Sequence, residues 1–415
     1  MILGKYSFGI GDRFCHQGKP QLAALIKAKE QGLDITPVWN KSHREHTSIG
    51  TSPSDTRKEA DDAITAYGWD RPYFVDADHI GLNNVDRFIK SSDFFTLDVA
   101  DFIGKPANET DVNSFVQKYK KYIGSLAING IEETFNITEE QIKAIADKFL
   151  PAVKQAGKIC RHIETAKGAD NFVTEVSMDE TDQPQTPVEM FFILAAIADE
   201  GIPAQTIAPK FTGRFNKGVD YVGNIRGFAK EFKEDVAVVA FAVKEFGLPK
   251  NLKLSIHSGS DKLSIYGPIA KVLKKFDAGL HIKTAGTTWL EELIGLAAAG
   301  GDGLSIAKEV YAKSLSRMDE LCAPYATVID INLSKLPIAQ EVDKWDGDRF
   351  ASALRHDRSC EHYNPNFRQI LHVAYKIAAE MGTRFSDALD KYEDIIAENV
   401  TDNIYERHIR PLFIE

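Results

Sequence analysis

Tyr73-Phe-Val-Asp76-Ala-Asp78-His79-Ile80 is the stretch that decides the fold class, because a short apolar run ends in two carboxylates and an imidazole. Apolar runs of this length, rich in aromatic and β-branched residues, are typical of buried strands. Burying two acids and a histidine at a strand end is costly unless a partner compensates their charge. A metal ion or a polar substrate is such a partner, so we expect a functional site at the end of this strand.

The first 290 residues alternate between strand-like and helix-like segments, which is typical of βαβ units with a parallel sheet. Eight strands favour a (β/α)8 TIM-like barrel, and a doubly wound open sheet is the alternative. The predicted strands are residues 6–10, 35–39, 73–75, 94–97, 172–176, 204–208, 252–256 and 281–284.

Two regions depart from this alternation. Residues 102–167 are predicted to form a mostly helical insertion, in which Thr138 followed by Gln141 is typical of a capped helix start. Residues 300–415 are predicted to be a mostly helical C-terminal elaboration, interrupted by a strand-like piece at 325–330. Because no Pro- or Ser-rich linker separates these parts, we predict a single barrel-based catalytic domain over residues 1–415.

The composition excludes several functional classes. The chain has 415 residues, 43% of them hydrophobic, and a net charge of −10, which fits a globular protein rather than a nucleic-acid binder. Its four cysteines are far apart, which argues against disulfides or a cysteine zinc site. We see neither a signal peptide nor an apolar stretch long enough for a membrane, so we expect a cytoplasmic protein. The sequence leaves open whether the chain forms a homo-oligomer.

Polar residues follow every predicted strand. In a parallel barrel, the C-terminal ends of the strands and the loops after them form the active site. Eight polar strand ends together are hard to explain by folding alone, because a buried unpaired charge is strongly destabilising. The polar ends begin at Asp12, Asn40, Asp76, Asp98, Glu175, Lys210, His257 and Lys283.

Three histidines are the candidate metal ligands: His79, His257 and His281. Imidazole together with carboxylate suits a divalent cation such as Zn, Mn, Fe, Co or Ni, and three protein ligands with open positions form the usual catalytic arrangement. His281 belongs to its strand rather than to the strand end. Glu175 and Glu180, together with Asp220, are therefore alternative third ligands, and a histidine that only forms hydrogen bonds is the simpler reading for each position.

Asp76 and Asp78 are alternate residues of one strand and share a face, whereas Asp78 and His79 point in different directions unless the strand ends there. A carboxylate beside a metal makes a good general base, because burial and neighbouring charges tune its pKa. The alternative for Asp78 is a carboxylate that orients a histidine ligand.

Basic and hydroxyl side chains at the strand ends suit an anionic small molecule, through a carboxylate or a phosphate group. Residues 258–260 (Ser-Gly-Ser) could also bind phosphate through backbone N–H groups, although no P-loop or GxGxxG motif is present. The candidate substrate-binding residues are Arg13, Lys41, Ser42, His43, Lys262 and Lys283.

Several of these runs are long and chemically unusual, and with them the chain resembles the tagaturonate/fructuronate epimerase family over most of its length. The runs are residues 74–80, 85–89, 92–101, 175–182, 257–262, 283–287 and 405–409. The resemblance implies a metal-dependent epimerase of hexuronate catabolism that interconverts D-tagaturonate and D-fructuronate. It also implies Asp78 as a base next to the metal ligand His79, a metal ligand at His257, and a further catalytic acid from residues 175–182, where Glu175 and Glu180 are the candidates.

The inverted carbon of these sugar acids lies one position beyond the carbon next to the ketone, so simple enolisation cannot invert it. We expect either retro-aldol cleavage and re-addition or a transient oxidation, and the latter would need a nicotinamide site that the sequence does not show. The alternatives are a metal-dependent aldolase or isomerase acting on another sugar acid or sugar phosphate, and a non-catalytic sugar-binding protein.

Overall fold

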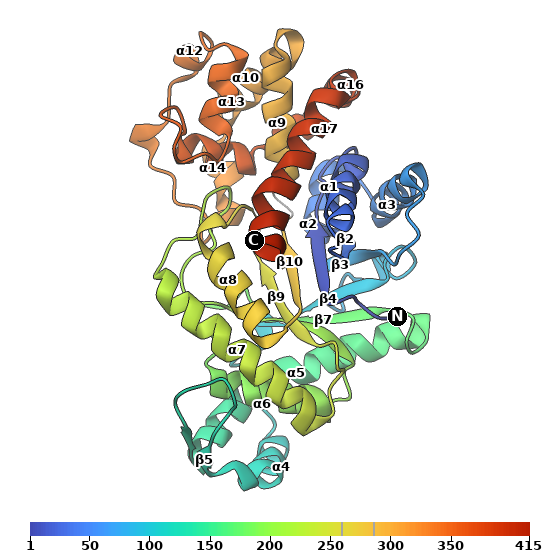
Figure 1. The fold of residues 1–415 in the computed structure, drawn as a ribbon, viewed down its shortest axis with the longest axis vertical. Coiled ribbons are helices and arrows are strands. Elements are labelled where there is room, and N and C mark those ends of the chain that lie inside the picture. The colour runs from blue at the N-terminus through green and yellow to red at the C-terminus, as the bar shows by residue number, and fades with distance from the viewer. Residues whose placement is uncertain (259, 285–286) are drawn as a thin grey trace.

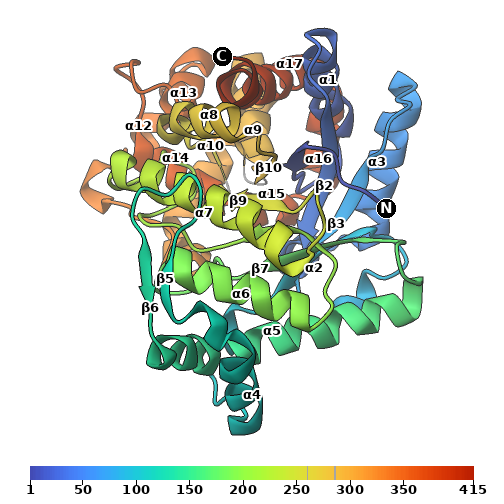
Figure 2. The ribbon, with the colours of Figure 1, turned by 60° about the horizontal axis from the view of Figure 1, so that its bottom comes forward.

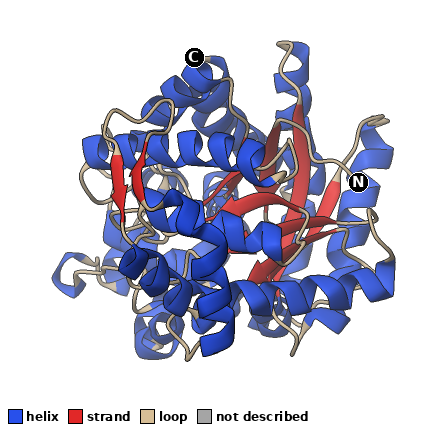
Figure 3. Ribbon diagram, turned by 90° about the horizontal axis from the view of Figure 1, so that it is seen from below, coloured by secondary structure: helices blue, strands red, loops and turns tan. Residues whose placement is uncertain are grey.

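Eight parallel strands close into a barrel in the computed structural model, which describes residues 1–258, 260–284 and 287–415. The order around the barrel is β1-β10-β9-β8-β7-β4-β3-β2, and Figure 3 shows these strands enclosed by helices. The strands are β1 (Tyr6–Ile10), β2 (Ile35–Ser42), β3 (Phe74–Ile80), β4 (Phe94–Asp98), β7 (Val173–Ser177), β8 (Ala204–Ala208), β9 (Lys253–His257) and β10 (Leu280–Lys283). The predicted (β/α)8 barrel is confirmed.

The barrel closes because β1, the first strand of the chain, pairs with the second strand, β2, and with the last strand, β10. Phe8 lies opposite Pro37 of β2 on one side and opposite Ile282 of β10 on the other. Both faces of these strands are buried, which explains their nearly continuous apolar character. The third strand runs five residues beyond its predicted end at Val75, so Asp76, Asp78 and His79 lie within it.

Helices between the strands cover the outside of the barrel. In Figure 2 helices α5, α6 and α7 lie side by side below α8, and each packs against the next. The helices between the strands are α1 (Gly18–Glu30), α2 (His43–Ile49), α3 (Pro53–Tyr67), α5 (Glu139–Lys167), α6 (Pro187–Asp199), α7 (Ile225–Phe246) and α8 (Leu263–Phe276). Among the described residues, no helix is both long and apolar enough to cross a membrane.

The insertion after β4 is mostly helical, as predicted, but it also contains a small sheet. Helix α4 (Glu109–Tyr119) leads to an antiparallel pair, β5 (Gly124–Leu126) with β6 (Phe135–Ile137). Each of these strands has only three residues, too few to give a periodic pattern. Helix α5 begins after Thr138, whose hydroxyl accepts a hydrogen bond from the backbone N–H of Gln141 at 3.1 Å, so the predicted cap is confirmed.

The C-terminal region is helical and packs on the first helices of the barrel. Figure 1 shows α17 beside α1, and α17 also packs on α9. The elements are α9 (Thr287–Ala299), α10 (Gly301–Ser316), α11 (Met318–Cys322), α12 (Ala339–Val342), α13 (Gly347–Leu354), α14 (Pro365–Val373), α15 (Tyr375–Glu380), α16 (Thr383–Lys391), α17 (Glu393–Asp402) and a last helical segment, Asn403–Ile414.

The strand predicted at residues 325–330 is wrong. A short 3-10 turn, Ala323–Tyr325, is followed by irregular chain. A closed barrel offers no free edge for a further strand, so a β-branched segment outside it has nothing to pair with.

Asp261, in the loop after β9, ties the C-terminal helices to the barrel. Its carboxylate oxygens lie 3.0 Å from Nη2 of Arg368, 3.2 Å from Nδ1 of His356 and 3.1 Å from Nε2 of His408. Burial alone would raise the pKa of the Asp261 carboxyl, but Arg368 and the two histidines hold it well below its usual range. The side chains of Asp261 and Arg368 are fully buried, so this ion pair depends entirely on protein partners.

We expect Arg368→Met to lower the free energy of unfolding by about 3–5 kcal/mol, because it leaves the Asp261 carboxylate buried without its cation. The matched control is Arg384→Met, which removes an exposed pair with Glu309 and should cost less than about 1 kcal/mol. Urea denaturation followed by circular dichroism measures both changes. Equal losses in the two variants would contradict the role given to Asp261.

Candidate active site

A backbone irregularity at the end of β3 brings Asp78 and His79 to the same site. Between Ala77 and Ile80, β3 holds one more residue than the facing part of β4, where Phe95 and Leu97 are the partners. His79 has a φ of +52°, a left-handed conformation that non-glycine residues rarely adopt. The bulge and this left-handed turn re-aim the imidazole, so that neighbouring side chains of one strand both reach the barrel mouth.

Each of two histidines has one ring nitrogen held by a carboxylate. Nδ1 of His79 lies 2.9 Å from Oδ1 of Asp78, and Nε2 of His257 lies 2.8 Å from Oε1 of Glu175. The two rings are in edge contact, with centroids 5.1 Å apart. Carboxylates in this position fix the tautomer and the orientation of an imidazole.

The other ring nitrogens, Nε2 of His79 and Nδ1 of His257, are buried and form no hydrogen bond. Both face Asp179: the distances are 3.5 Å from His79 Nε2 to Asp179 Oδ1 and 3.2 Å from His257 Nδ1 to Asp179 Oδ2. One ligand atom from each of the three residues lies within 4.8 Å of the other two. Two imidazole nitrogens that form no regular hydrogen bond and converge on one carboxylate fit the donor set of a divalent transition metal.

Lys283, at the end of β10, is the cation that pairs with the carboxylates beside the two histidines. Its ammonium lies 2.7 Å from Asp76 Oδ2, 3.0 Å from Asp78 Oδ1 and 2.9 Å from Glu175 Oε1. Burial alone would lower the pKa of Lys283, but these carboxylates raise it well above its usual value. A fourth carboxylate, Asp179, faces the two histidines rather than Lys283.

The carboxyl groups of this cluster do not behave alike. Burial raises the pKa of Asp76 to about 7, although Lys283 opposes the shift. For Asp78 and Glu175 the same burial is outweighed, chiefly by Lys283 and the neighbouring histidine, so both pKa values lie well below the usual range. Asp78 and Glu175 are therefore charged groups that hold their histidines.

Six of the sequence-predicted residues meet at the mouth. A cavity of about 280 Å³ opens there, and an adjoining one of about 290 Å³ shares Arg44, Glu180, Lys217 and Tyr325 with it. His257 lines the second cavity. The six predicted residues that line the first cavity are Arg13, Ser42, His43, Asp78, His79 and Glu180.

Two predicted substrate-binding lysines point elsewhere. The ammonium of Lys41 donates to the backbone carbonyl of Arg13, and that of Lys262 donates to the carbonyl of Val219 at 2.9 Å and to the hydroxyl of Ser260 at 2.8 Å. Both side chains are buried and neither lines the cavity among the described residues. Both ammonium groups therefore donate to oxygens of the protein inside the loops that form the site.

His281 does not lie with the candidate metal ligands His79, Asp179 and His257. It lies two residues before Lys283 on the same strand face, one layer deeper in the barrel, where its Nδ1 lies 2.9 Å from the hydroxyl of Ser7. Burial lowers the pKa of His281 to about 3. The layer spacing of a parallel barrel therefore separates it from His79 and His257.

The Ser-Gly-Ser segment is only partly described, since Gly259 lies outside the described residues, as do Ala285 and Gly286. The hydroxyl of Ser258 donates to the carbonyl of Lys283 at 2.6 Å, and Ser260 accepts from Gly218 N–H at 3.1 Å. Both serine side chains are used within the protein.

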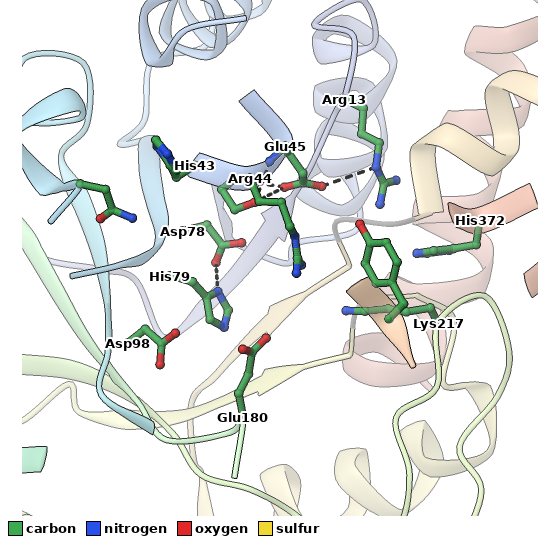
Figure 4. A pocket seen from close by; sticks show the side chains of 13 residues that line it. Arg13, His43, Arg44, Glu45, Asp78, His79, Asp98, Glu180, Lys217 and His372 are labelled. Atoms are coloured by element: carbon green, nitrogen blue, oxygen red, sulfur yellow. Dashed lines mark hydrogen bonds and ion pairs between the residues drawn. The ribbon is translucent and has the colours of Figure 1, made fainter. Parts of the chain in front are cut away.

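The sequence did not identify Asp179 as the partner of His79 and His257, although the acidic run 175–182 that contains it was singled out. It also missed several residues that line the cavity from helix α2, from loops and from the C-terminal region, where no strand-end rule applies. Among them are Arg44 and Lys217, which Figure 4 labels, and Tyr325. His372 of α14, also labelled, lines the cavity as well.

A closed parallel barrel with a polar, charge-lined cavity at the C-terminal ends of its strands defines a barrel enzyme for a small polar substrate. A family model described as tagaturonate epimerase (UxaE) matches residues 2–412, so the chain belongs to the tagaturonate epimerase family, and it is an isomerase. The resemblance seen in the sequence is confirmed.

Individual relatives agree with this assignment. The tagaturonate/fructuronate epimerase of Thermotoga maritima is 26% identical over 419 residues, which covers 97% of this chain and 80% of that protein. Crystal structures of the fructuronate-tagaturonate epimerase UxaE of Cohnella laeviribosi share the fold. A form complexed with two glycerols has a TM-score of 0.81 at 22% identity, covering 100% of this chain and 83% of that chain. The native form has a TM-score of 0.77 at 22% identity, covering 98% and 81%.

We expect Lys283→Met to destabilise the metal-free protein at neutral pH by about 3–5 kcal/mol, because three buried carboxylates lose their cation. Without Lys283 the pKa values of these carboxyls rise above those of the unfolded chain. The folded state then binds more protons, so the deficit should shrink as the pH falls from 8 to 5.

Thermal unfolding in chelator, at several pH values, measures this effect. The control is Lys391→Met, which removes an exposed pair with Asp302 and should change little at any of these pH values. A Lys283→Met deficit that stays constant or grows towards pH 5 would contradict the ion cluster.

Proposed function

We propose that the protein interconverts D-tagaturonate and D-fructuronate, with a divalent metal held by His79, Asp179 and His257. The observation that supports the metal is the pair of buried imidazole nitrogens that form no regular hydrogen bond and lie 3.5 and 3.2 Å from one carboxylate, Asp179. The family and the named activity of the Thermotoga maritima relative support the substrate pair.

The two sugar acids differ at C4, counted from the hydroxymethyl end, and carry their ketone at C2. Enolisation exchanges the proton at C3 and leaves C4 untouched, so the reaction must break another bond. We propose that the hydroxyl on C4 loses its proton and becomes a carbonyl while the C3–C4 bond breaks. The electron pair of that bond passes to C3 and is delocalised into the ketone as an enediolate.

The products of this cleavage are the enediolate of dihydroxyacetone and a three-carbon aldehyde acid. Rotation of the aldehyde presents its other face, C3 re-adds to it, and the new C4 alkoxide takes back a proton. Atoms and electrons balance without an oxidant. A bound divalent cation would supply Lewis-acid stabilisation of the negative charge that develops on the ketone oxygen.

Glu180 is the proposed base. Its carboxylate lines both cavities and, among the described residues, forms no hydrogen bond or ion pair. Asp78, the base implied by the family resemblance, is instead bonded to His79 and Lys283, which hold its pKa well below the usual range. We therefore propose that Asp78 and Glu175 orient His79 and His257, and that Glu180 moves the proton.

Removal of metal tests the proposal as a whole. After chelation and dialysis, we expect no conversion of D-tagaturonate in proton NMR, and we expect added Mn²⁺ or Zn²⁺ to restore it. Asp179→Asn should weaken metal binding at least about tenfold, as measured by titration calorimetry. Full conversion by protein shown to be metal-free would overturn metal dependence, and no conversion at any metal loading would overturn the reaction.

Replacement of Glu180 tests the base. We expect Glu180→Gln to lower kcat by about 100- to 10,000-fold, the usual contribution of a positioned base, while metal content stays unchanged. Glu398→Gln is the matched control: it neutralises an exposed acid on α17, away from both cavities, and should lower kcat less than about threefold. If both variants keep wild-type kcat, Glu180 is not the base.

Isotope exchange tests the carbon–carbon cleavage. Conversion in the presence of ¹³C-labelled dihydroxyacetone should place label in C1–C3 of both acids, because the fragment can be exchanged before re-addition. Absence of label together with tightly bound NAD in the purified protein would instead support oxidation and reduction at C4.

A further inference from the structure

Arg13 is a buried cation without adequate partners. Its side chain is 6% exposed, yet Nε and Nη1 are buried and form no hydrogen bond. The nearest carboxylate oxygen, Oε1 of Glu45, is 3.5 Å from Nε. The guanidinium carbon lies 4.3 Å from the centre of the Tyr375 ring, a stacking contact that fixes the plane of the group. Buried guanidinium donors without acceptors are costly, so this arrangement points to an anion that is not part of the chain.

Two further cations line the same cavity. The guanidinium of Arg44 lies 5.0 Å from the centre of the Tyr325 ring. Lys217 is half-buried, and among the described residues its ammonium forms no hydrogen bond or ion pair. Burial lowers the pKa of Lys217, which a bound anion would reverse.

Among the described residues, the carboxylate nearest to Arg13 is that of Glu45, and one of its oxygens is already engaged. Glu45 accepts hydrogen bonds from the N–H of Ser42 at 3.1 Å and from its hydroxyl at 3.0 Å, as part of the cap of α2. Figure 4 shows Arg13, Lys217 and His372 on one side of the cavity and Asp78, His79, Asp98 and Glu180 on the other. A substrate anion is attracted to the first side and repelled from the second.

The C-terminal helices contribute a neutral donor and the stacking rings. His372, on α14, is buried and its Nδ1 has no partner. Burial and the neighbouring cations hold the pKa of His372 well below its usual value, so the ring is neutral and can donate one hydrogen bond. Tyr375 stacks on Arg13 from the next helix, α15.

We propose that Arg13, Arg44, Lys217 and His372 form a carboxylate subsite that binds the acid group of the substrate, with Arg13 as the specificity-determining residue. The ketone end then lies toward His79, Asp179 and His257. This inference rests on the proposed function and adds the direction in which the substrate lies. An arginine fork matches a carboxylate with two parallel hydrogen bonds, which a neutral hydroxymethyl group cannot replace.

The subsite also has a consequence for the reaction. Cleavage between C3 and C4 leaves the carboxylate on the aldehyde fragment. Arg13 therefore anchors that fragment by its acid end, while the aldehyde turns about the C4–C5 bond. Loss of the anchor should release the aldehyde acid to solvent, which aldehyde trapping and mass spectrometry detect.

The test compares an acid with a neutral ligand of the same shape. Tagatose carries a hydroxymethyl group where tagaturonate carries its carboxylate. We expect Arg13→Gln to raise KM for tagaturonate about 100-fold, the loss of a charge-assisted bidentate contact, and to leave the inhibition constant of tagatose within about threefold. Arg13→Lys should fall between the wild type and Arg13→Gln, and the trapped aldehyde acid should increase in Arg13→Gln.

Arg44→Gln provides a second variant, since Arg44 is less buried than Arg13 and its loss spares the packing around Tyr375. It should raise KM for tagaturonate about tenfold. The control is Arg161→Gln on helix α5, whose guanidinium is already paired with Glu200, and it should change neither constant. If the wild type converts tagaturonate but both variants keep the wild-type ratio of KM to the tagatose constant, the subsite is wrong. If the wild type does not convert tagaturonate, the proposed function fails instead.

Discussion

The site depends on one buried ion cluster, in which the ammonium of Lys283 bridges Asp76, Asp78 and Glu175. Two of these carboxylates also hold His79 and His257, so the same ammonium fixes both imidazoles indirectly. The remaining nitrogen of each ring faces one further carboxylate, Asp179. Two imidazoles fixed in this way, with a carboxylate between them, are the physical basis for the metal binding that we propose.

The barrel could be predicted from the sequence because buried parallel strands give nearly continuous apolar runs, and polar residues then mark their C-terminal ends. The position of His79 could not, because its left-handed backbone comes from the bulge against β4, a pairing between separate strands. Lys41 and Lys262 look like Lys283 in the sequence. Only the folded loops show which ammonium meets backbone carbonyls and which meets carboxylates.

The residues that sequence reasoning missed come from outside the strand ends. Lys217 lies in a long loop, Tyr325 ends a short 3-10 turn and His372 lies on α14, and no short motif marks any of them as part of the cavity wall. The fully buried pair of Asp261 with Arg368 holds these helices against the barrel. The helical elaboration thus supplies part of the site, and its attachment to the barrel is a structural requirement of the chemistry that we propose.

The proposed metal site at His79, Asp179 and His257 is tested most directly by a crystal structure of the metal-loaded protein, with data collected at the absorption edge of the bound metal. We expect one anomalous peak within bonding distance of His79 Nε2, Asp179 and His257 Nδ1, with Asp78 and Glu175 still on the opposite ring nitrogens. A peak elsewhere, or none in fully active protein, would contradict it.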